Sequence, residues 1–458
     1  MKAIAIIGAG FCGTITAVNL IKYSTEPIKI FLIESRKEFA KGVAYSTSNL
    51  LHLLNVRASG MSAFDDEPEH FLKWLKNNND NPLISNNINE NDFISRSIYG
   101  LYLKSILDEY KSIAIDKNIK LIEINDKAIN VIKKEQNIVI NFENNSEILV
   151  DKLLIATGNY KPRNINIKDN NFYENNSYYQ DPWGSNIFEN YNELENILLI
   201  GSGLTMVDLV LSFYQRKHKG LIYVISPHGY LPQSHKEVSK YKNFLDENNL
   251  PTTALKAFKI IKNEIREAKK NNIDWRSVID SIRPFNQRIW LNFSLYEKKS
   301  FMSHLRHRWG VLRHRMAPEI ANIFDELINK HQIKVYAGKI HELVYRDNNI
   351  NVLFTDKKSK CTNTLTVSKV INCTGPEADI LKIDDLLIKN LINNGIIKPD
   401  EMNLGIDSII DGNIINKDNI IEENIYTIGT NLKGLLWEST AVPELRKQTY
   451  KIALSLLK

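Results

Sequence analysis

The sequence is poor in cysteine and has no long apolar run. Its 458 residues include only three cysteines, Cys12, Cys361 and Cys373, none of them at CxxC or zinc-finger spacing. This pattern predicts neither a disulfide framework nor a metal site, and it favours a reducing cytoplasm. No stretch of about 18 apolar residues occurs, so no transmembrane helix is expected. No nucleophile-elbow serine or paired acid–base motif stands out either, so the sequence does not indicate hydrolytic chemistry.

The bulk composition is ordinary for a globular protein. Hydrophobic residues make up 43% of the chain, charged residues 24%, and the formal net charge is +6. The length predicts two or three domains. We interpret the small positive charge as a lysine-rich surface with pockets for anionic small molecules, and we expect no nucleic-acid partner. The oligomeric state is left open.

A strand–glycine turn–helix–strand pattern occurs twice, about 190 residues apart. The first copy has strands at 3–7 and 29–33 around a helix at 14–23, and the second has strands at 196–200 and 221–226 around a helix at 205–215. Buried parallel strands have such short isoleucine-rich runs. The pattern predicts an α/β protein with two Rossmann-like dinucleotide-binding domains, the first domain being split by the second.

The order of the segments predicts the domain boundaries. We expect the first domain at residues 1–189 and 366–458, and the second at 190–365. A mainly helical insertion is expected at about 240–330, where strand signals are few.

The first glycine turn lies between a predicted strand and a predicted helix. It reads Gly8-Ala9-Gly10-Phe11-Cys12-Gly13. In this context Gly8 permits the tight turn, Gly10 lets a pyrophosphate approach the backbone, and Gly13 allows close helix packing. The helix N-terminus offers free N–H groups to phosphates. Glu34, at the end of the next strand, can accept hydrogen bonds from both ribose hydroxyls.

The second glycine turn is less complete. It reads Gly201-Ser202-Gly203-Leu204-Thr205-Met206, so methionine replaces the third glycine. The following strand ends at Ser226 without an acidic residue. A carboxylate there would repel a ribose 2′-phosphate, whereas Ser226, His228, His235 and Lys236 would tolerate or bind one. This favours NADP(H) over NAD(H), although a duplicate domain that binds nothing stays open.

Three further segments have features of cofactor sites. Small residues let the chain pass close to a cofactor at two strand ends, Ala156-Thr157-Gly158 and Cys373-Thr374-Gly375. Glu438, Ser439 and Thr440 lie where a last helix should begin. Its N-terminus could face an electron-rich ligand edge, or these residues could simply cap the helix.

A basic and aromatic cluster occupies residues 283–315. Arg283, Arg288 and Arg315 are our candidates for contacts with an anion, since arginine suits carboxylates and phosphates. The cluster also contains His304, Arg306, His307, Arg308, Trp309, Arg313 and His314. The alternative is a solvated helical face with internal ion pairs.

These residues together resemble the FAD/NAD(P)-binding protein family, whose members are mostly named only for their cofactors. The layout is also distantly similar to flavin-containing and N-hydroxylating monooxygenases. The resemblance covers nearly the whole chain and rests on GAGFCG at 8–13, HLLNVRASGMSAFDDEPEHFLKWL at 52–75, SRSIYGLYL at 95–103, GSGLTMVD at 201–208, RPFNQRIW at 283–290, RHRMAPE at 313–319, INCTGP at 371–376 and LWESTAVPELR at 436–446.

The resemblance implies specific cofactor contacts. It implies that the first glycine turn and Glu34 hold FAD, that the segment near Asn55 and Met61 passes close to the flavin, and that Gly201, Gly203 and Thr205 serve a nicotinamide nucleotide. Many flavoproteins of this layout carry Gly-Asp after the last strand, where the aspartate binds the ribityl chain. Here the pair is Gly429-Thr430, which leaves that contact open.

The leading functional hypothesis is an NAD(P)H-dependent flavin monooxygenase acting on a small polar or anionic substrate, such as an amine or amino acid. Asn55 is a candidate for a polar contact near the flavin, and no catalytic acid or base is assigned. A reductase or dehydrogenase without oxygen insertion is the second hypothesis, and a non-catalytic flavin-binding sensor or scaffold is the third. A disulfide reductase is disfavoured because no CxxC or CxxxxC follows the first motif.

Overall fold

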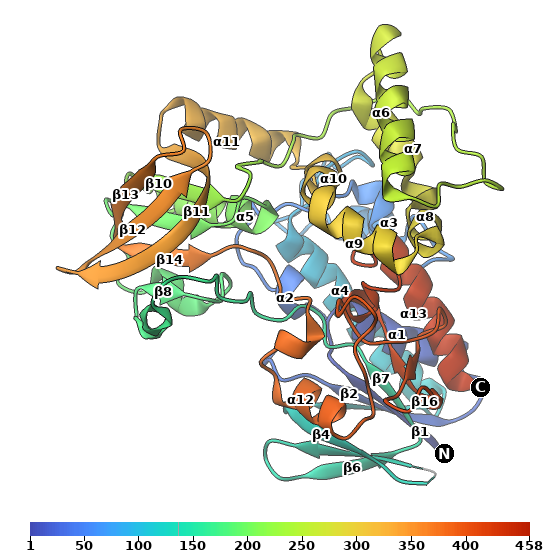
Figure 1. Ribbon diagram of the computed structural model, residues 1–458. Helices are drawn as coiled ribbons and strands as arrows, with labels where there is room; N and C mark the ends of the chain where they lie inside the picture. The colour runs from blue at the N-terminus through green and yellow to red at the C-terminus, as the bar shows by residue number, and fades with distance from the viewer. Residues whose placement is uncertain (136) are drawn as a thin grey trace.

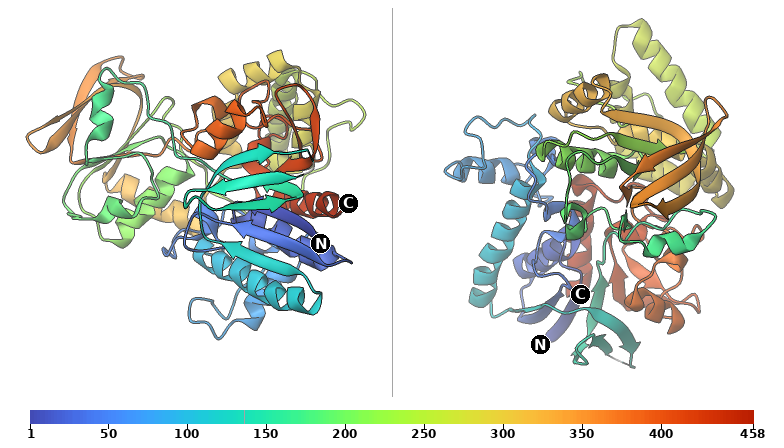
Figure 2. Two further views of the ribbon diagram at one scale, coloured as in Figure 1. Left: turned by 90° about the horizontal axis from the view of Figure 1, so that it is seen from below. Right: turned by 90° about the vertical axis from the view of Figure 1, so that its left-hand side faces the viewer.

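The computed structural model describes residues 1–135 and 137–458. It has two sheet-based domains and a separate helical unit (Figure 1). The N-terminal and C-terminal segments, blue and red in Figure 2, lie together in one of the sheet domains. The second sheet domain and the helical unit are formed by the intervening chain, so the first domain is split in sequence.

The first domain contains a six-stranded sheet that is parallel except for one edge strand. Isoleucine-rich β1 is central, pairing Ile4 with Ile30 of β2 on one side and with Lys152 of β7 on the other. The strands, in sheet order, are β15 (Asn413–Ile415), β16 (Ile421–Thr427), β7 (Lys152–Ile155), β1 (Lys2–Ile7), β2 (Ile28–Ile33) and β3 (Lys120–Ile124).

Two apolar cores cover the two faces of this sheet, as expected for a parallel sheet buried on both sides. One core contains residues of α1 (Phe11–Tyr23), α4 (Arg96–Asp116) and α13 (Val442–Leu457), with α3 (His70–Asn77) beside them. The other contains residues of α12 (Leu386–Asn393) and of an antiparallel meander, β4 (Ala128–Lys133), β5 (Ile138–Phe142) and β6 (Glu147–Val150). Short helical turns complete the domain: α2 (Gly42–Tyr45), η1 (Ala58–Gly60), η5 (Ile380–Lys382) and η6 (Gly429–Leu432).

The second domain contains a seven-stranded sheet. Its strands, in sheet order, are β13 (Thr362–Val367), β12 (Asn349–Asp356), β11 (Ile333–Arg346), β10 (Ile222–Ser226), β9 (Ile197–Ile200), β14 (Lys369–Asn372) and β8 (Tyr178–Tyr179). The five strands from β11 to β8 are parallel, and α5 (Leu204–Gln215) and α11 (Pro318–Asn329) share a core on one face. The turns η2 (Asn170–Glu174) and η3 (Ser185–Phe188) precede β9.

This sheet extends beyond the predicted domain boundaries. Strands β8 and β14 lie outside the predicted range 190–365, yet β14 pairs with β9 and β8 pairs with β14. Strand pairing across the domain junction leaves no signal in a local pattern, so the predicted range does not include these two strands, and the boundaries stay a prediction. We propose boundaries near residues 160 and 375, after the two predicted strand-end turns.

The helical unit has its own core and contains helices α6 to α10. Ile279, Trp290 and Phe293 are buried in that core, and Trp437 of the first domain packs against it. Its elements are α6 (Ala254–Lys270), α7 (Trp275–Ser281), η4 (Arg283–Phe285), α8 (Asn286–Asn292), α9 (Leu295–His304) and α10 (Arg306–Arg313). Within residues 1–135 and 137–458, no helix has the length and apolarity needed to cross a membrane. The same described residues hold no group of three histidine, cysteine or acidic side chains arranged for a metal ion.

Candidate functional site

A cavity of about 330 Å³ lies at the carboxyl ends of the parallel strands of the first sheet. Its walls come from the segments that follow β1, β2, β3, β7 and β16, which are distant in sequence. Open α/β sheets bind ligands at this edge, where the strand order reverses around the central strand. The predicted cofactor residues that line the cavity are Gly8, Gly10, Phe11, Cys12, Glu34, Thr157, Gly158, Gly429 and Thr440.

The first glycine turn brings β1, β7 and α1 close together. Gly8 has φ +103°, and a Cβ atom there would lie 2.4 Å from the carbonyl oxygen of Ala156. A Cβ atom at Gly13 would lie 1.8 Å from the carbonyl oxygen of Gly8. Both glycines are therefore required by the close packing, and Gly13 acts through the shape of the turn since it does not line the cavity.

Gly10 has a different role because it stands at the N-cap of α1. No side chain caps this helix, so its first N–H groups are available to a ligand. A Cβ atom at Gly10 would meet only the Cα atom of Gly42, at 3.6 Å, which is an ordinary contact. The protein fold could therefore accept a side chain at this position, and the space is kept for whatever fills the cavity. A helix N-terminus of this kind suits a pyrophosphate.

Glu34 is fixed by the backbone of the turn that it faces. One carboxylate oxygen accepts a hydrogen bond from the Ala9 N–H at 3.0 Å, and the other accepts one from the Arg36 N–H at 3.0 Å. The side chain is buried but lines the cavity. Each oxygen keeps a lone pair free for a ligand hydroxyl, as recognition of a ribose requires.

Thr430, the residue that departs from the common Gly-Asp pair, also lines this cavity. Its hydroxyl is buried and has no hydrogen-bond partner among the described residues. The cavity is the place where such a group can find one, because buried hydroxyls are normally paired. The threonine therefore offers one hydrogen bond at the position where the resemblance implied an aspartate.

Several cavity residues were not predicted from the sequence. They come from loops without a recognisable motif: Arg36, Lys41, Tyr45, Asp126, Lys127, Tyr160 and Asp385. Only Arg36 gave a usable signal, since it follows Glu34 by two residues. The others reach the cavity through the fold.

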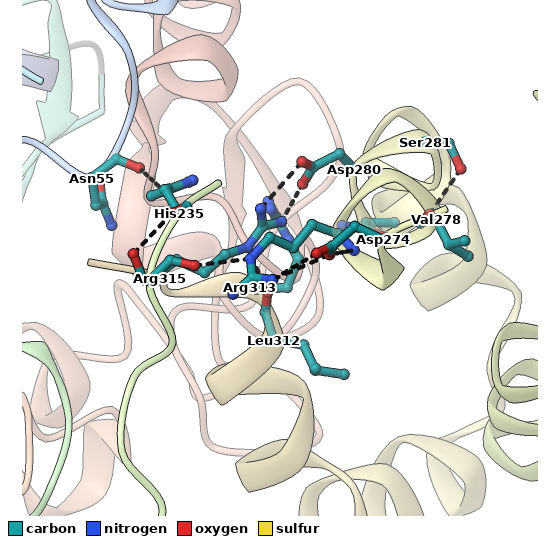
Figure 3. Close-up of polar contacts among 12 residues, drawn as sticks. Asn55, His235, Asp274, Val278, Asp280, Ser281, Leu312, Arg313 and Arg315 are labelled. Atoms are coloured by element: carbon teal, nitrogen blue, oxygen red, sulfur yellow. Dashed lines mark hydrogen bonds and ion pairs between the residues drawn. The ribbon is translucent and has the colours of Figure 1, made fainter. Parts of the chain in front are cut away.

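Four predicted flavin contacts lie outside the cavity walls. Met61 is buried in the core of the first domain, and Asn55 is exposed with its carbonyl accepting a hydrogen bond from His235 Nε2 at 3.0 Å (Figure 3). Glu438 faces the helical unit, and the Ser439 hydroxyl donates to the Gly429 carbonyl at 2.8 Å. Helix α13 begins at Val442, two residues beyond Thr440, because Pro443 fits its first turn.

The second glycine turn repeats the first in backbone detail. Gly201 has φ +106°, and a Cβ atom there would lie 2.5 Å from the carbonyl oxygen of Cys373. Helix α5 begins at Leu204, followed by Thr205, and Gly203 is an uncapped N-cap with nothing within 4 Å of its Cβ position. Thr374 is exposed, and Gly375 has φ +88° at the junction between the domains. Met206 is fully buried, so the helix packs on this sheet through a side chain.

The end of β10 presents basic and hydroxyl groups. The Ser226 hydroxyl lies 2.8 Å from that of Ser202 and accepts a hydrogen bond from the Gly229 N–H at 3.0 Å. His228 is exposed, and its ring stacks on Tyr230 with centroids 5.3 Å apart. Partial burial lowers the pKa of His228, and the charges of Lys357 and Arg308 lower it further. Two cations therefore stand near this histidine, which was the position expected for a 2′-phosphate.

Two residues predicted for the same phosphate lie elsewhere. His235 packs on Phe93, and burial lowers its pKa to about 4 while it donates to Asn55. Lys236 lies 3.8 Å from Asp274. These residues follow β10 by several positions, and the chain has already turned toward the helical unit, where His235 contacts Asn55 and Lys236 lies near Asp274.

The three arginines predicted to contact an anion each have a carboxylate partner. Arg283 makes two hydrogen bonds of 2.8 Å to Glu444, and Arg288 lies 3.0 Å from Glu247. Arg315 is buried and pairs with Asp280, as Figure 3 shows. Their charges are balanced within the protein, which agrees with the alternative interpretation of internal ion pairs.

The two domains are also held together by a buried polar network. Arg96 at the start of α4 pairs with Asp208 of α5 at 2.7 Å. His52 Nε2 donates to the Asp208 carbonyl at 2.8 Å and lies 3.0 Å from the Ser212 hydroxyl. Helix α5 is thus anchored to the first domain through Asp208 and Ser212.

Residues 5–160 match the model of a family described as FAD-NAD(P)-binding. The matched region contains β1, the first glycine turn, Glu34 and the strand end at Thr157. It therefore includes most of the cavity wall. This part of the chain therefore resembles an FAD-NAD(P)-binding domain, and a second Rossmann-like domain follows it.

Solved structures show the fold of the whole chain. An ornithine N-hydroxylase from Kutzneria sp. 744 is 13% identical, with a TM-score of 0.67 and coverage of 99% of this chain and 98% of that chain. The L-lysine 6-monooxygenase of Pseudomonas syringae is 13% identical, with a TM-score of 0.66 and coverage of 99% and 98%. The bacillithiol disulfide reductase of Staphylococcus aureus is 13% identical, with a TM-score of 0.55 and coverage of 100% and 99%. No curated protein matches the sequence.

Proposed function

We propose that this protein is an FAD-dependent, NADPH-using monooxygenase acting on a small amine or amino acid. The observation that carries the proposal is the pairing of two uncapped glycine turns at the carboxyl edges of two sheets, within a fold shared over 99% of the chain with an ornithine N-hydroxylase. At 13% identity this likeness supports the architecture, and the activity is our inference. The three free cysteines agree with the cytoplasm as its compartment.

The residues of the first cavity fit FAD. Phosphates would lie against the N–H groups of Phe11 and Cys12, and Glu34 would accept hydrogen bonds from the adenosine ribose. The unpartnered Thr430 hydroxyl would bind the ribityl chain. Once bound, the flavin supplies the redox chemistry that no side chain can perform.

The residues of the second turn fit NADPH. The nucleotide phosphates would lie at the N-terminus of α5, beside Gly203 and Leu204. Ser226 and His228, with Arg308 and Lys357 nearby, would hold the 2′-phosphate. No carboxylate stands at the end of β10 to repel it.

The protein's own contribution to the reaction is binding, orientation and exclusion of water. The His52–Asp208–Arg96 network fixes the second domain against the first, so a nucleotide held on α5 keeps a constant position relative to the first cavity. The helical unit packs Trp290 against Trp437 of the first domain with ring centroids 5.0 Å apart, and an apolar contact of this kind would exclude water from that interface.

The cysteines argue against a disulfide reductase. Cys12 lies in the first glycine turn, and burial raises its pKa to about 12, so it is not a thiolate at neutral pH. Cys373 is buried at the end of β14, and Cys361 is exposed in the hairpin of β12 and β13. No pair of thiols is placed to exchange with a disulfide.

Oxygen uptake during NADPH oxidation tests the proposal. The purified FAD-loaded protein is given NADPH in air together with L-ornithine, L-lysine or cadaverine, and oxygen, peroxide and hydroxylated product are measured. Oxygen uptake that one amine couples to a hydroxylated product is expected. NADPH oxidation that proceeds only with an added quinone and yields no oxygenated product would favour a reductase. Protein that remains colourless after addition of FAD would favour neither enzyme.

A further inference from the structure

Two hydroxyl groups meet on the wall of the first-domain cavity. Thr157 and Tyr160 both line this cavity, and their hydroxyl oxygens lie 2.6 Å apart. Gly158, between them, has φ +63°, a left-handed conformation that lets the chain turn back on itself. The Tyr160 ring packs against the apolar core that contains Ala128 and Leu387, which holds its hydroxyl in place. The two side chains therefore form one hydrogen-bonded pair.

Asn431 adds a third member to this pair. Its amide nitrogen lies 3.2 Å from the Thr157 hydroxyl oxygen and 3.4 Å from the Ile155 carbonyl oxygen. A carbonyl oxygen can only accept a hydrogen bond, so the amide nitrogen of Asn431, and not its amide oxygen, faces both atoms. Asn431 therefore donates to Thr157 and occupies one lone pair of the threonine oxygen.

The Tyr160 hydroxyl is the donor in its contact with Thr157. A phenol is more acidic than an aliphatic alcohol, so it is the stronger donor and the weaker acceptor of the two. Burial raises the pKa of Tyr160, so the phenol keeps its proton at neutral pH. The nearby Asp385 is engaged elsewhere, since one of its oxygens accepts a hydrogen bond from the Ile388 N–H at the start of α12.

The hydroxyl hydrogen of Thr157 is left without an acceptor. A threonine hydroxyl has one O–H donor and two lone pairs, and Tyr160 and Asn431 occupy both lone pairs. Among the described residues, the Thr157 hydroxyl has no third hydrogen-bonding partner. Hydroxyl groups that are withdrawn from water normally find a partner, and this one lines the cavity. A ligand there must therefore present an acceptor atom to Thr157.

The surroundings of Thr157 favour a phosphate as that acceptor. A Cβ atom at Gly8 would lie 3.2 Å from the Thr157 backbone nitrogen, so Thr157 adjoins the first glycine turn. This turn leads into the uncapped N-terminus of α1, which suits a pyrophosphate. A charged phosphate oxygen accepts strong hydrogen bonds from a hydroxyl that can only donate. A carbonyl oxygen or ring nitrogen of the flavin has the same acceptor chemistry and is the other source.

We propose that Thr157 donates a hydrogen bond to a phosphate oxygen of FAD, and that Tyr160 and Asn431 are positioning residues that turn the Thr157 hydroxyl hydrogen toward the cavity. We call these three residues the donor relay. The proposal rests on the proposed function, because it takes FAD as the ligand of this cavity, and it deepens that function by assigning part of the cofactor's orientation to the relay. The sequence indicated only that small residues at Thr157 let the chain pass close to a cofactor.

Release of FAD from the loaded full-length protein tests the donor relay. Flavin that passes a filter at a series of protein dilutions gives the affinity for FAD, and displacement of FAD by ADP gives the affinity for the half of the cofactor without the flavin. The variants are Thr157→Val, Thr157→Ser and Tyr160→Phe. Thr427→Val and Tyr426→Phe are the matched controls, because each loses one hydroxyl hydrogen bond in the same sheet and neither residue lines the cavity.

Thr157→Val should lower the affinities for FAD and ADP by the same factor, about tenfold to hundredfold, the range of a hydrogen bond to a charged group. Thr157→Ser keeps the donor and should stay within about threefold of wild type. Tyr160→Phe should lower both affinities by about threefold to tenfold, because Thr157 keeps its hydrogen but loses its fixed direction. Added to Thr157→Val, Tyr160→Phe should have no further effect, since no Thr157 hydroxyl is left to position.

Four results would overturn the donor relay. The first is equal FAD affinity in wild type and Thr157→Val, or an equal loss in the controls. The second is a loss of FAD affinity with unchanged ADP affinity, which would give the hydrogen bond to the flavin ring. The third is a larger loss in Tyr160→Phe than in Thr157→Val, which would make Tyr160 the contacting residue. The fourth is a full additional loss from Tyr160→Phe in the Thr157→Val background, which would make its role structural.

NADPH oxidation and oxygen uptake are measured on the same wild-type sample. Wild type that binds FAD through the donor relay but forms no oxygenated product would contradict the proposed function and leave the relay standing. Wild type that binds neither FAD nor ADP would contradict both.

Discussion

The two glycine turns of this protein have almost the same backbone and very different surroundings. Gly8 and Gly201 have φ values of +103° and +106°, and a Cβ atom at either would lie 2.4 or 2.5 Å from the carbonyl oxygen of a neighbouring strand end. Both turns lead into a helix whose N-terminus has no side-chain cap. The shared geometry shows that a strand–turn–helix unit requires these glycines whatever it binds.

The differences between the turns lie in the residues around them. The first has Glu34 at the next strand end and a defined cavity, whereas the second has Ser226 and an open Gly203. The third glycine, Gly13, is replaced by the buried Met206. We therefore expect ligand choice to be set by the neighbouring strand end and by loops from elsewhere in the chain, because the glycines of the two turns are nearly alike.

The largest expected effect comes from placing the same charge, an aspartate, in each of the two glycine turns. Gly10→Asp should weaken FAD binding by roughly 3 kcal/mol or more, about a hundredfold, because a carboxylate would face the pyrophosphate. Gly203→Asp should leave FAD bound and weaken NADPH by a similar factor. Flavin content and the rate of anaerobic reduction measure the two outcomes. Loss of FAD in Gly203→Asp would show that the two sites are not separate.

A second pair of substitutions tests the backbone conformation that the two glycine turns share. Gly8→Ala and Gly201→Ala should each destabilise the fold by about 1–3 kcal/mol from the backbone conformation alone, with a further cost from the close carbonyl oxygen. Denaturant unfolding of both variants measures the effect. The comparison would fail if one variant were as stable as wild type while the other unfolded.

Ser226→Asp should change the preference of the second domain between NADPH and NADH. A carboxylate at the end of β10 would repel the 2′-phosphate, so the preference for NADPH over NADH should fall by about tenfold. The ratio of kcat/KM for the two nucleotides is the measurement, with flavin content as the control. An unchanged ratio would mean that the 2′-phosphate does not lie beside Ser226.

A further expected effect is a pH dependence of stability that arises in the second domain. Burial lowers the pKa of His218 to about 4, while its Nδ1 lies 2.9 Å from the Tyr191 hydroxyl. The neutral ring is favoured in the folded protein, so its contribution to stability is present above the ordinary pKa of about 6.5 and is lost as pH falls toward 4. His218→Gln should flatten the fall in unfolding free energy between those pH values, and His331→Gln, at an exposed position, should not.

The sequence predicted the elements that depend on local pattern. Strand β1, helix α1 and Glu34 lie within 34 residues, so glycine spacing and apolar runs were enough to place them. The cavity loops at Lys41, Tyr45 and Asp126 could not be predicted, because they meet only when five strand ends come together.

The directions of side chains in the C-terminal segment could not be predicted from the sequence either. Glu438 belongs to the segment predicted to begin the last helix beside a cofactor, and its carboxylate turns to the helical unit, where Trp309 and Arg313 hold it. The arginines of residues 283–315 could not be divided into paired and unpaired groups without knowing where Glu444, Glu247 and Asp280 lie. Pairing between distant charges has no signature in a single sequence.

The central claim is that the first domain binds FAD and the second binds NADPH. The most direct test is the visible spectrum of the purified protein before and after anaerobic addition of NADPH. The account predicts a yellow protein with oxidised FAD that bleaches when NADPH is added. A protein that stays colourless in excess FAD, or bound FAD that NADPH does not reduce, would contradict it.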